Sequence, residues 1–304
     1  MGTPDFCVPI LEGLIANYDV LAVVSQPDKK VGRHQILTST PAKEVALKHN
    51  ILVLQPNNIK KDYDSILELK PDIIITCAYG QIIPKELLEF PRYGCINVHA
   101  SLLPKYRGGA PIHRAIIDGC NKTGITIMYM AEGMDSGDII SQRETIIESS
   151  DNLESLHDRL SIMGKDLLLE TLPSIISGTN ERVSQDLKKV SYAYNIKREE
   201  EHIDFNKKSL DIFNLIRGLS PVPGSYSLFD DKEMKVYSAR IGDVDTSEFV
   251  PGKVINVYKD GIGVATKDKE IIFTDVKLSG KKRMSAGSFI NGFGKDKLLG
   301  KVFK

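Results

Sequence analysis

The sequence predicts an α/β fold over its first part and a small β-rich domain over its last part. Its 304 residues, 41% hydrophobic and 26% charged, suffice for one large domain and one smaller one and exclude a collagen-like or disordered chain. Up to about residue 145, short β-branched runs alternate with segments of helical period. From about residue 204, short β-like runs follow one another closely. We therefore expect a Rossmann-like domain with a mostly parallel sheet, followed by a small OB-like β-barrel.

Continuous β-branched runs in the first part are typical of strands that are buried on both faces of a sheet. Two segments of helical period, 40–50 and 63–70, lie between these runs. Two later runs, 123–131 and 138–147, alternate more strongly and predict two further strands. The buried runs are Asp19 to Ser25, Ile51 to Leu54, Asp72 to Cys77 and Cys95 to Val98.

A long helix is predicted next, over 152–176, because Leu and Met recur there at helical intervals and Asp151 or Asn152 can serve as its N-cap. The polar segment 177–201 breaks this pattern and is predicted to be an extended linker with little core of its own. We therefore place the first domain at 1–180, the linker at 181–203 and the second domain at 204–304.

The second domain is predicted to begin with a short helix at 210–217. Five β-like runs separated by turn signals follow this helix, and their close spacing favours a small barrel. The runs are 226–229, 234–241, 253–258, 261–265 and 270–276.

The beginning of the sequence departs from this scheme. Gly2 to Phe6 has the character of a strand-to-helix loop, yet almost nothing precedes it where a doubly wound sheet has a central strand. Such a gap would leave backbone donors and acceptors unpaired. We therefore expect either a short segment before Met1 or a sheet that is built differently at this point.

Composition also excludes membrane-spanning and disulfide-rich proteins. The longest apolar runs, such as Ile73 to Cys77, are far shorter than the roughly 20 residues that cross a bilayer, and the N-terminus has no targeting pattern. The four cysteines are scattered without a C-x-x-C pair, which argues against disulfides and thiolate metal sites. We expect a cytoplasmic protein with free thiols and no metal.

Charge cancels over the whole chain, which has 40 basic and 40 acidic residues, but its distribution is uneven. After Val276 there are eight Lys or Arg residues and one acid, Asp296. Such a local excess could contact phosphates, or it could belong to a solvated tail.

Candidate catalytic side chains lie at the end of the strand predicted at 95–98. Asn97 and His99 are two residues apart in extended chain, so both side chains leave the strand on the same face. Asn97 offers an amide donor and His99 a group that titrates near neutrality. Because ligands bind at the carboxyl ends of strands in open α/β sheets, the pair could act on a substrate. The alternative is a histidine that only satisfies a backbone carbonyl.

Two further loops are expected to face the same crevice. Residues 132–138 carry three carboxylates among glycines that permit close backbone approach, and one of these acids could pair with His99. Residues 78–84 leave the strand predicted at 72–77. An Asp- and Gly-rich turn and an ordinary strand-to-helix connection are the alternatives.

Several motifs of the sequence resemble those of the methionyl-tRNA formyltransferase family, within the superfamily of folate-dependent formyltransferases. The Asn, His, S-L-L-P and D-x-G-D set is shared by the superfamily, whereas the basic loop after Q-P-D and the C-terminal domain are the tRNA-directed elements. The motifs cover both domains: MGTPDF at 1–6, SQPDKKVGR at 25–33, AYGQIIP at 78–84, CINVHASLLPKYRGGAPIHRAI at 95–116, TGITIM at 123–128, GMDSGDI at 133–139, IRGLSPVPGSY at 216–226 and GKKRMSAG at 280–287.

The resemblance implies transfer of a formyl group from 10-formyltetrahydrofolate to the α-amino group of methionine on initiator tRNA. It implies that Asn97 donates to the formyl oxygen, that His99 stabilises the oxyanion and shuttles the proton, and that Asp135, rather than Asp138, orients His99. It also implies that folate is bound without a metal, by Gly80, Gln81, Ile82, Ile83, Ser101, Leu102, Leu103 and Pro104. Ile82 and Leu103 would sandwich the pterin ring, although such side chains could equally belong to the core.

The resemblance further implies that initiator Met-tRNA is bound by basic residues of two regions. One region is the loop 27–35, whose counterpart in the family enters the acceptor stem, and the other is the C-terminal domain. The residues expected to contact tRNA are Lys29, Lys30, Arg33, Lys43, Lys281, Lys282 and Arg283. We expect the protein to act as a monomer.

Three other functions stay open at this point. A folate-dependent formyltransferase that acts on a small amine is disfavoured by the basic loop and the C-terminal domain. A tRNA-binding module with an inactive catalytic domain is disfavoured by the intact set of Asn97, His99 and Asp135. A nicotinamide-dependent oxidoreductase is disfavoured because Gly2-Thr3-Pro4 lacks the glycine-rich phosphate fingerprint.

Overall fold

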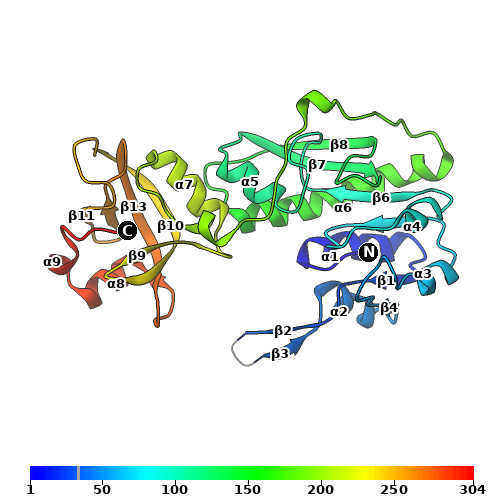
Figure 1. Cartoon of the computed structure of the whole chain (residues 1–304), viewed down its shortest axis with the longest axis horizontal. Coiled ribbons are helices and arrows are strands. Elements are labelled where there is room, and N and C mark those ends of the chain that lie inside the picture. The colour runs from blue at the N-terminus through cyan, green and yellow to red at the C-terminus, as the bar shows by residue number, and fades with distance from the viewer. Residues whose placement is uncertain (33–34) are drawn as a thin grey trace. The chain divides into compact units, whose positions relative to one another are not determined.

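The computed structural model describes residues 1–32 and 35–304 (Figure 1). The chain divides into two compact units, of which the first contains Met1–Pro111, Lys122–Ile146 and His157–Tyr194, and the second contains Ile112–Asn121, Ile147–Leu156 and Asn195–Lys304. The domain bounds inferred above, at residues 180 and 203, stay a prediction. Among the residues so described, no helix is long and apolar enough to cross a membrane.

The first unit is a Rossmann-like α/β domain, as predicted. Two of its strand pairs, β1 with β4 and β5 with β6, are parallel, and β7 and β8 continue from β6 in antiparallel order. The strands are β1 (Ala22–Val24), β4 (Leu52–Leu54), β5 (Ile74–Thr76), β6 (Cys95–His99), β7 (Lys122–Tyr129) and β8 (Ile139–Ile146). A separate hairpin of β2 (Lys29–Val31) and β3 (Ile36–Thr38) extends away from β1 (Figure 1).

Helices alternate with these strands along the chain, and the starts of two of them follow from the sequence. Thr40 caps α2 by accepting a hydrogen bond from the Lys43 amide at 3.3 Å, and Asn152 caps α6 by accepting one from the Ser155 amide at 2.9 Å. No residue ranges were predicted for α1, α4 and α5, which are short or almost uniformly apolar and therefore show no clear period. The helices are α1 (Val8–Asn17), α2 (Pro41–Lys48), α3 (Asp64–Glu68), α4 (Lys85–Glu89), α5 (Pro111–Ile117) and α6 (Leu153–Ser177).

The irregularity predicted at the beginning of the chain is a gap between β1 and β5. Met1 and Gly2 bridge this gap at one end, where the Gly2 amide donates to the Val24 carbonyl and the Cys77 amide donates to the Met1 carbonyl, both at 2.9 Å. Behind them lies a cavity of about 470 Å³, lined mainly by apolar residues of α1, β1 and β5. The sheet is therefore split at the position where a doubly wound sheet has a central strand.

The second unit is built on an antiparallel sheet of order β11-β12-β13-β10-β9, with β14 paired to β13. Strand pairing within the described part of this unit follows an open path, so the predicted barrel is not closed by its strands. The C-terminal residues instead bond to both outer strands, since the Val254 amide donates to Lys301 at 2.7 Å and the Leu228 amide donates to Lys304 at 2.8 Å. The elements are α7 (Ser209–Gly218), β9 (Ser225–Phe229), β10 (Lys232–Asp245), β11 (Val254–Val257), β12 (Ile262–Val264), β13 (Lys269–Leu278), β14 (Met284–Ser285), α8 (Ala286–Phe293) and α9 (Lys295–Leu298).

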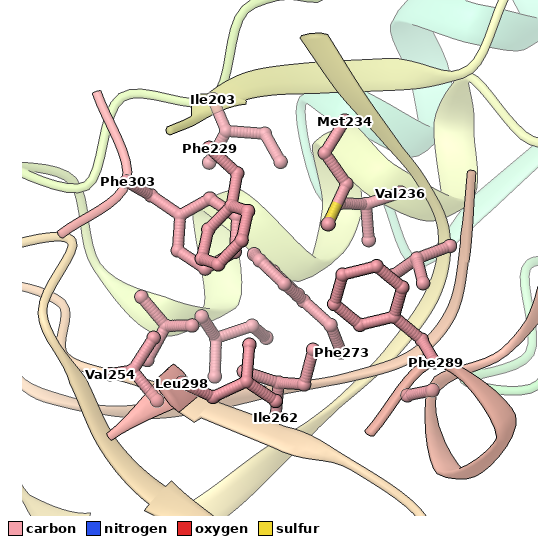
Figure 2. Close-up of a cluster of buried hydrophobic side chains, with 14 of the residues drawn as sticks. Ile203, Phe229, Met234, Val236, Val254, Ile262, Phe273, Phe289, Leu298 and Phe303 are labelled. Atoms are coloured by element: carbon pink, nitrogen blue, oxygen red, sulfur yellow. The ribbon is translucent and has the colours of Figure 1, made fainter. Parts of the chain in front are cut away.

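The core of the second unit is rich in aromatic side chains (Figure 2). The ring of Phe303 lies 5.0 Å from that of Phe229 and 5.6 Å from that of Phe273, measured between centroids. Phe289 of α8 and Leu298 of α9 are buried in the same cluster. The segment after Val276 is therefore not a solvated tail, because it forms two helices that complete this core.

Candidate active site

The end of β6 places two of the expected catalytic side chains. β6 is paired on both sides, with β5 and β7, which fixes the positions of its side chains. The hydroxyl of Thr76 on β5 donates to Oδ1 of Asn97 at 2.8 Å. This bond orients the amide so that its donor, Nδ2, lies 3.4 Å from Oδ1 of Asp135. The amide donor of Asn97 is therefore aimed at the loop that carries the carboxylate.

His99 is nearly buried, with 6% of its side chain exposed, and both of its ring nitrogens have polar neighbours. Nε2 lies 2.9 Å from the carbonyl oxygen of Tyr106. Because a carbonyl can only accept a hydrogen bond, Nε2 carries the proton. Nδ1 faces Oδ2 of Asp135 at 3.7 Å. The backbone contact that sequence reasoning set against catalysis is thus present, but it occurs together with the carboxylate contact.

Asp135 is held by the backbone of a neighbouring loop. The Gly108 amide donates to Oδ2 of Asp135 at 2.8 Å, and Asp135 itself has a φ of 45°, a left-handed conformation that is costly for a residue with a side chain. Asp138 lies elsewhere, since its carboxylate accepts hydrogen bonds from Arg182 at 3.2 Å and Ser184 at 3.1 Å. The structure therefore brings Asp135, rather than Asp138, to His99.

A segment that the sequence assigned to a linker runs beside these loops; we call residues 183–194 the strap. Oε1 of Gln185 accepts from Nε and Nη2 of Arg107, at 3.0 and 2.7 Å. Nε2 of the same side chain donates to the carbonyl oxygens of Asp135 and Gly137, both at 2.8 Å. Arg107 is 5% exposed, so the strap supplies the partner that its buried guanidinium requires.

The other end of the strap pairs with the backbone around Arg107. The Arg107 amide donates to the carbonyl oxygen of Ser191 at 2.9 Å, and the Ala193 amide donates to that of Arg107 at 2.7 Å. The Ser191 hydroxyl also accepts from the Tyr106 amide at 3.0 Å. The loop that contacts both His99 and Asp135 is therefore fixed by the strap. Sequence reasoning missed this because pairing between remote irregular segments produces no periodic pattern.

The residues expected to bind folate lie on two loops. Gln81 holds the first loop in place, since its Oε1 accepts from the Ile59 amide at 2.8 Å and its Nε2 donates to the carbonyl oxygen of Pro56 at 3.3 Å. Gly80 has a φ of 89°, which favours glycine. Ile83 is buried, whereas Ile82 is 65% exposed.

The second loop, Ser101 to Pro104, is tied down by internal hydrogen bonds. The buried Ser101 hydroxyl donates to the carbonyl oxygen of Lys105 at 2.7 Å, and the Leu103 amide donates to Oγ1 of Thr126 at 3.2 Å. Leu103 is 3% exposed and therefore belongs to the core. Leu102 and Pro104 are half-buried.

Among the first-unit residues expected to contact tRNA, two lysines are exposed and a third is hydrogen-bonded to its neighbours. Lys29 and Lys30 are exposed on the hairpin. Arg33 lies outside the described residues. Nζ of Lys43 donates to Asp28 at 2.6 Å and to Gln55 at 2.9 Å, and Gln55 in turn donates to Asp28. The hydrogen bonds from Lys43 and Gln55 lower the pKa of Asp28. Lys43 thus directs its charge toward the base of the hairpin.

The second unit presents its expected tRNA contacts between β13 and β14. Lys281 and Lys282 are exposed in this turn. Arg283 donates to both carboxylate oxygens of Asp275, at 2.9 to 3.0 Å, and its guanidinium lies 4.3 Å from the centroid of the Tyr237 ring. Arg283 is therefore held against the sheet, while the two lysines extend from it.

The described residues contain no group of three or more His, Cys, Asp or Glu side chains that could hold a metal ion. The four cysteines are free thiols in the structure. Burial raises the pKa of Cys7 to about 11 and that of Cys95 to about 12, so both thiols stay protonated near neutral pH.

Two family models match the sequence, that of formyl transferase over residues 2–172 and that of the formyl transferase C-terminal domain over residues 195–294. The methionyl-tRNA formyltransferase of Staphylococcus aureus strain MW2 is 51% identical to this chain, over 99% of the chain and 97% of the relative. The chain belongs to the methionyl-tRNA formyltransferase family. This assignment covers both units, since the alignment spans nearly the whole of each sequence.

Solved structures of other formyltransferases share the fold of this family member. The sugar 3N-formyl transferase WlaRD, solved with dTDP and 5-N-formyl-THF, has a TM-score of 0.65 and 21% identity, covering 92% of this chain and 97% of that one. An N-formyltransferase from Helicobacter canadensis, in complex with folinic acid and dTDP-3-aminofucose, has a TM-score of 0.67 and 22% identity, covering 90% and 96%. At such identities the likeness speaks for the fold alone.

Proposed function

We propose that this chain transfers the formyl group of 10-formyltetrahydrofolate to the α-amino group of methionine carried by initiator tRNA. The observation that carries the proposal is the convergence of Asn97 Nδ2 and His99 Nδ1 on the carboxylate of Asp135, at 3.4 and 3.7 Å. This arrangement stands at a strand end, in a chain that is 51% identical to a methionyl-tRNA formyltransferase.

We assign each of the three side chains a role that its contacts support. Asn97 presents an amide donor whose direction is fixed by Thr76, and such a preorganised donor stabilises the oxyanion that forms when an amine attacks a formyl carbon. His99 has its proton on Nε2, so Nδ1 is the nitrogen that can accept the proton of the attacking amine and return it to the leaving group. Asp135 favours the imidazolium that exists between these two transfers.

The loops around this site fit a flat ligand. Ile82 is 65% exposed and Met134 is 54% exposed, on the two loops that flank the predicted crevice. Exposed apolar side chains beside backbone donors and acceptors suit a pterin ring, which has apolar faces and a polar edge. We assign folate binding to residues 80–83, which include the exposed Ile82, and to residues 101–104 on the family resemblance. Bound formyl-folate supplies the one-carbon group, and the protein supplies the orientation and the proton path.

Initiator tRNA would contact the exposed lysines of both units. Lys29 and Lys30 on the hairpin and Lys281 and Lys282 near β14 can reach phosphates without breaking an ion pair described above. Arg33 remains part of this proposal. Lys43 and Arg283 would have to leave Asp28 and Asp275, respectively, to make such contacts. We also propose that the protein acts in the cytoplasm as a monomer.

A formylation assay tests the proposal. The purified protein is incubated with 10-formyltetrahydrofolate and initiator Met-tRNA, and formyl-methionine is measured after the ester is hydrolysed. We expect product with this tRNA and none in the absence of the folate. Parallel reactions offer a nucleotide-linked amino sugar and glycinamide ribonucleotide as acceptors. Formylation of such a small amine, without product on Met-tRNA, would assign the chain to a different reaction.

A further inference from the structure

Two exposed tyrosines stand at the end of the strap. Tyr192 is 51% exposed and Tyr194 is 61% exposed. Because they alternate along an extended segment, their side chains lie on the same face. The two rings stack with centroids 5.6 Å apart and an interplanar angle of 8°. A stacked pair of this kind presents a flat aromatic surface in a preset orientation.

The tyrosine pair is connected to the catalytic residues through the backbone. Tyr192 forms a parallel bridge with Arg107, and the amides of Arg107 and Ala193 make the hydrogen bonds that hold this bridge. The next residue after Arg107 is Gly108, whose amide donates to Asp135. The segment that carries the tyrosines is therefore hydrogen-bonded to the loop whose Gly108 amide holds the carboxylate of Asp135, so a ligand on the tyrosines would be restrained relative to that loop.

Exposed basic residues lie on the strap itself and on the loop with which the strap pairs. Lys105 lies two residues before Arg107, on the loop that contacts His99 and Asp135, and Lys188 lies on the strap; both are exposed. Proteins usually bind single-stranded nucleic acid with aromatic rings on which bases stack. Basic side chains beside these rings contact the phosphate backbone.

We propose that Tyr192 and Tyr194 form a stacking platform for a nucleobase at the single-stranded acceptor end of the tRNA. The proposal rests on the proposed function, since it concerns the substrate of the same site. The methionine ester is attached to the terminal ribose, so a base held on the tyrosines restrains the amine that must reach Asn97 and His99. A planar base matches the parallel rings, whereas a thioether prefers the edge of a ring.

Binding of uncharged tRNA tests the platform without turnover. A tRNA with 2-aminopurine in place of its terminal adenine is titrated with the wild-type protein and with Tyr192→Leu, Tyr194→Leu and the corresponding Phe variants. We expect quenching of the fluorescence by the wild type and the Phe variants, and a clear loss of quenching in the Leu variants. The matched control is Phe249→Leu, since Phe249 is an aromatic side chain of the second unit with 43% exposure.

Kinetics with Met-tRNA provide the second readout. If the Leu variants no longer stack one base, we expect their KM for Met-tRNA to rise roughly 5- to 150-fold. The KM for the formyl donor should stay unchanged, and the Phe variants should behave like the wild type. Circular dichroism and thermal melting show whether a variant is folded, and the Phe variants test the platform even where a Leu variant unfolds.

Several outcomes would overturn the platform. Unchanged quenching in both Leu variants would do so, as would an equal rise in the KM values for tRNA and formyl donor. A loss that depends on the esterified amino acid but leaves quenching intact would assign the rings to the methionine side chain instead. Absence of formyl product with the wild-type protein would contradict the proposed function. The quenching experiment tests the platform independently, because it needs no turnover.

Discussion

At the scale of single residues, the contacts of His99 decide which of its nitrogens can do chemistry. The Tyr106 carbonyl fixes the proton on Nε2, which leaves Nδ1 as the acceptor beside Asp135. A histidine that served only the fold would need the first contact and not the second. The side chain of Asp135 is 18% exposed, so under the proposed function a substrate amine would reach this pair from the solvent side.

We expect His99→Ala to lower kcat by about 100- to 10,000-fold, the usual contribution of a general acid–base group, while the Kd for tRNA stays unchanged. The measurements are steady-state formylation and equilibrium binding of tRNA. His49→Ala is the matched control, because His49 is an exposed histidine at the end of α2. A fall in kcat that is accompanied by an equal loss of tRNA affinity would make His99 a structural residue.

The sequence could predict part of this site and not the rest. The spacing of Asn97 and His99 was enough to place both side chains on one face, because side chains alternate along a strand. The choice of Asp135 over Asp138 came from family resemblance alone, since both acids have the same local pattern. A backbone carbonyl as the partner of His99 was among the alternatives, but Tyr106 could not be singled out, because a backbone carbonyl leaves no trace in the residue types.

At the scale of elements, the strands and helices with a hydrophobic period were predicted correctly, whereas the irregular segments that pair with remote loops were not. The strands β1 and β4 to β8 and the helix α6 lie within or close to the predicted ranges, because burial imposes a period on their sequences. α8 was missed since its basic flanks resemble a tail, although Phe289 and Ile290 are buried. The strap was missed because its stability comes from hydrogen bonds to remote loops rather than from an apolar face.

From the contacts of the strap, we predict that Gln185 affects turnover although it is not one of the proposed catalytic residues. Gln185→Leu removes the partner of the Arg107 guanidinium and the two donors that hold the backbone of Asp135 and Gly137. We expect kcat to fall about 10- to 100-fold through loss of alignment, with little change in KM for either substrate.

Steady-state kinetics and thermal melting check this effect of the strap. Leu187→Ala is the control, because Leu187 lies on the same segment with 78% exposure and should tolerate truncation. A Gln185→Leu protein with wild-type kcat and an unchanged melting temperature would show that the strap does not position the carboxylate.

At the scale of the whole molecule, a net charge of zero conceals local excesses of basic residues. The exposed pair Lys29 and Lys30 lies in the first unit, and the exposed pair Lys281 and Lys282 lies in the second. A polyanion responds to such local charge rather than to the sum, because each phosphate contact releases counterions independently. Composition alone therefore could not have revealed a nucleic-acid partner.

Salt dependence of tRNA binding tests the contribution of the hairpin pair. The slope of log K against log salt changes by about 0.9 for each lost contact to duplex phosphates, so Lys29→Gln combined with Lys30→Gln should make it shallower by roughly 1 to 2. The Kd is measured by anisotropy from roughly 50 to 300 mM salt, a range in which this slope is normally resolved. The matched control combines Lys60→Gln with Lys61→Gln, an exposed adjacent pair in the same unit. Both double variants change the net charge equally, so an effect of total charge would shift both slopes alike. A change confined to the hairpin variant would instead locate the phosphate contacts on β2, and equal slopes for the two would remove the hairpin lysines from the tRNA interface.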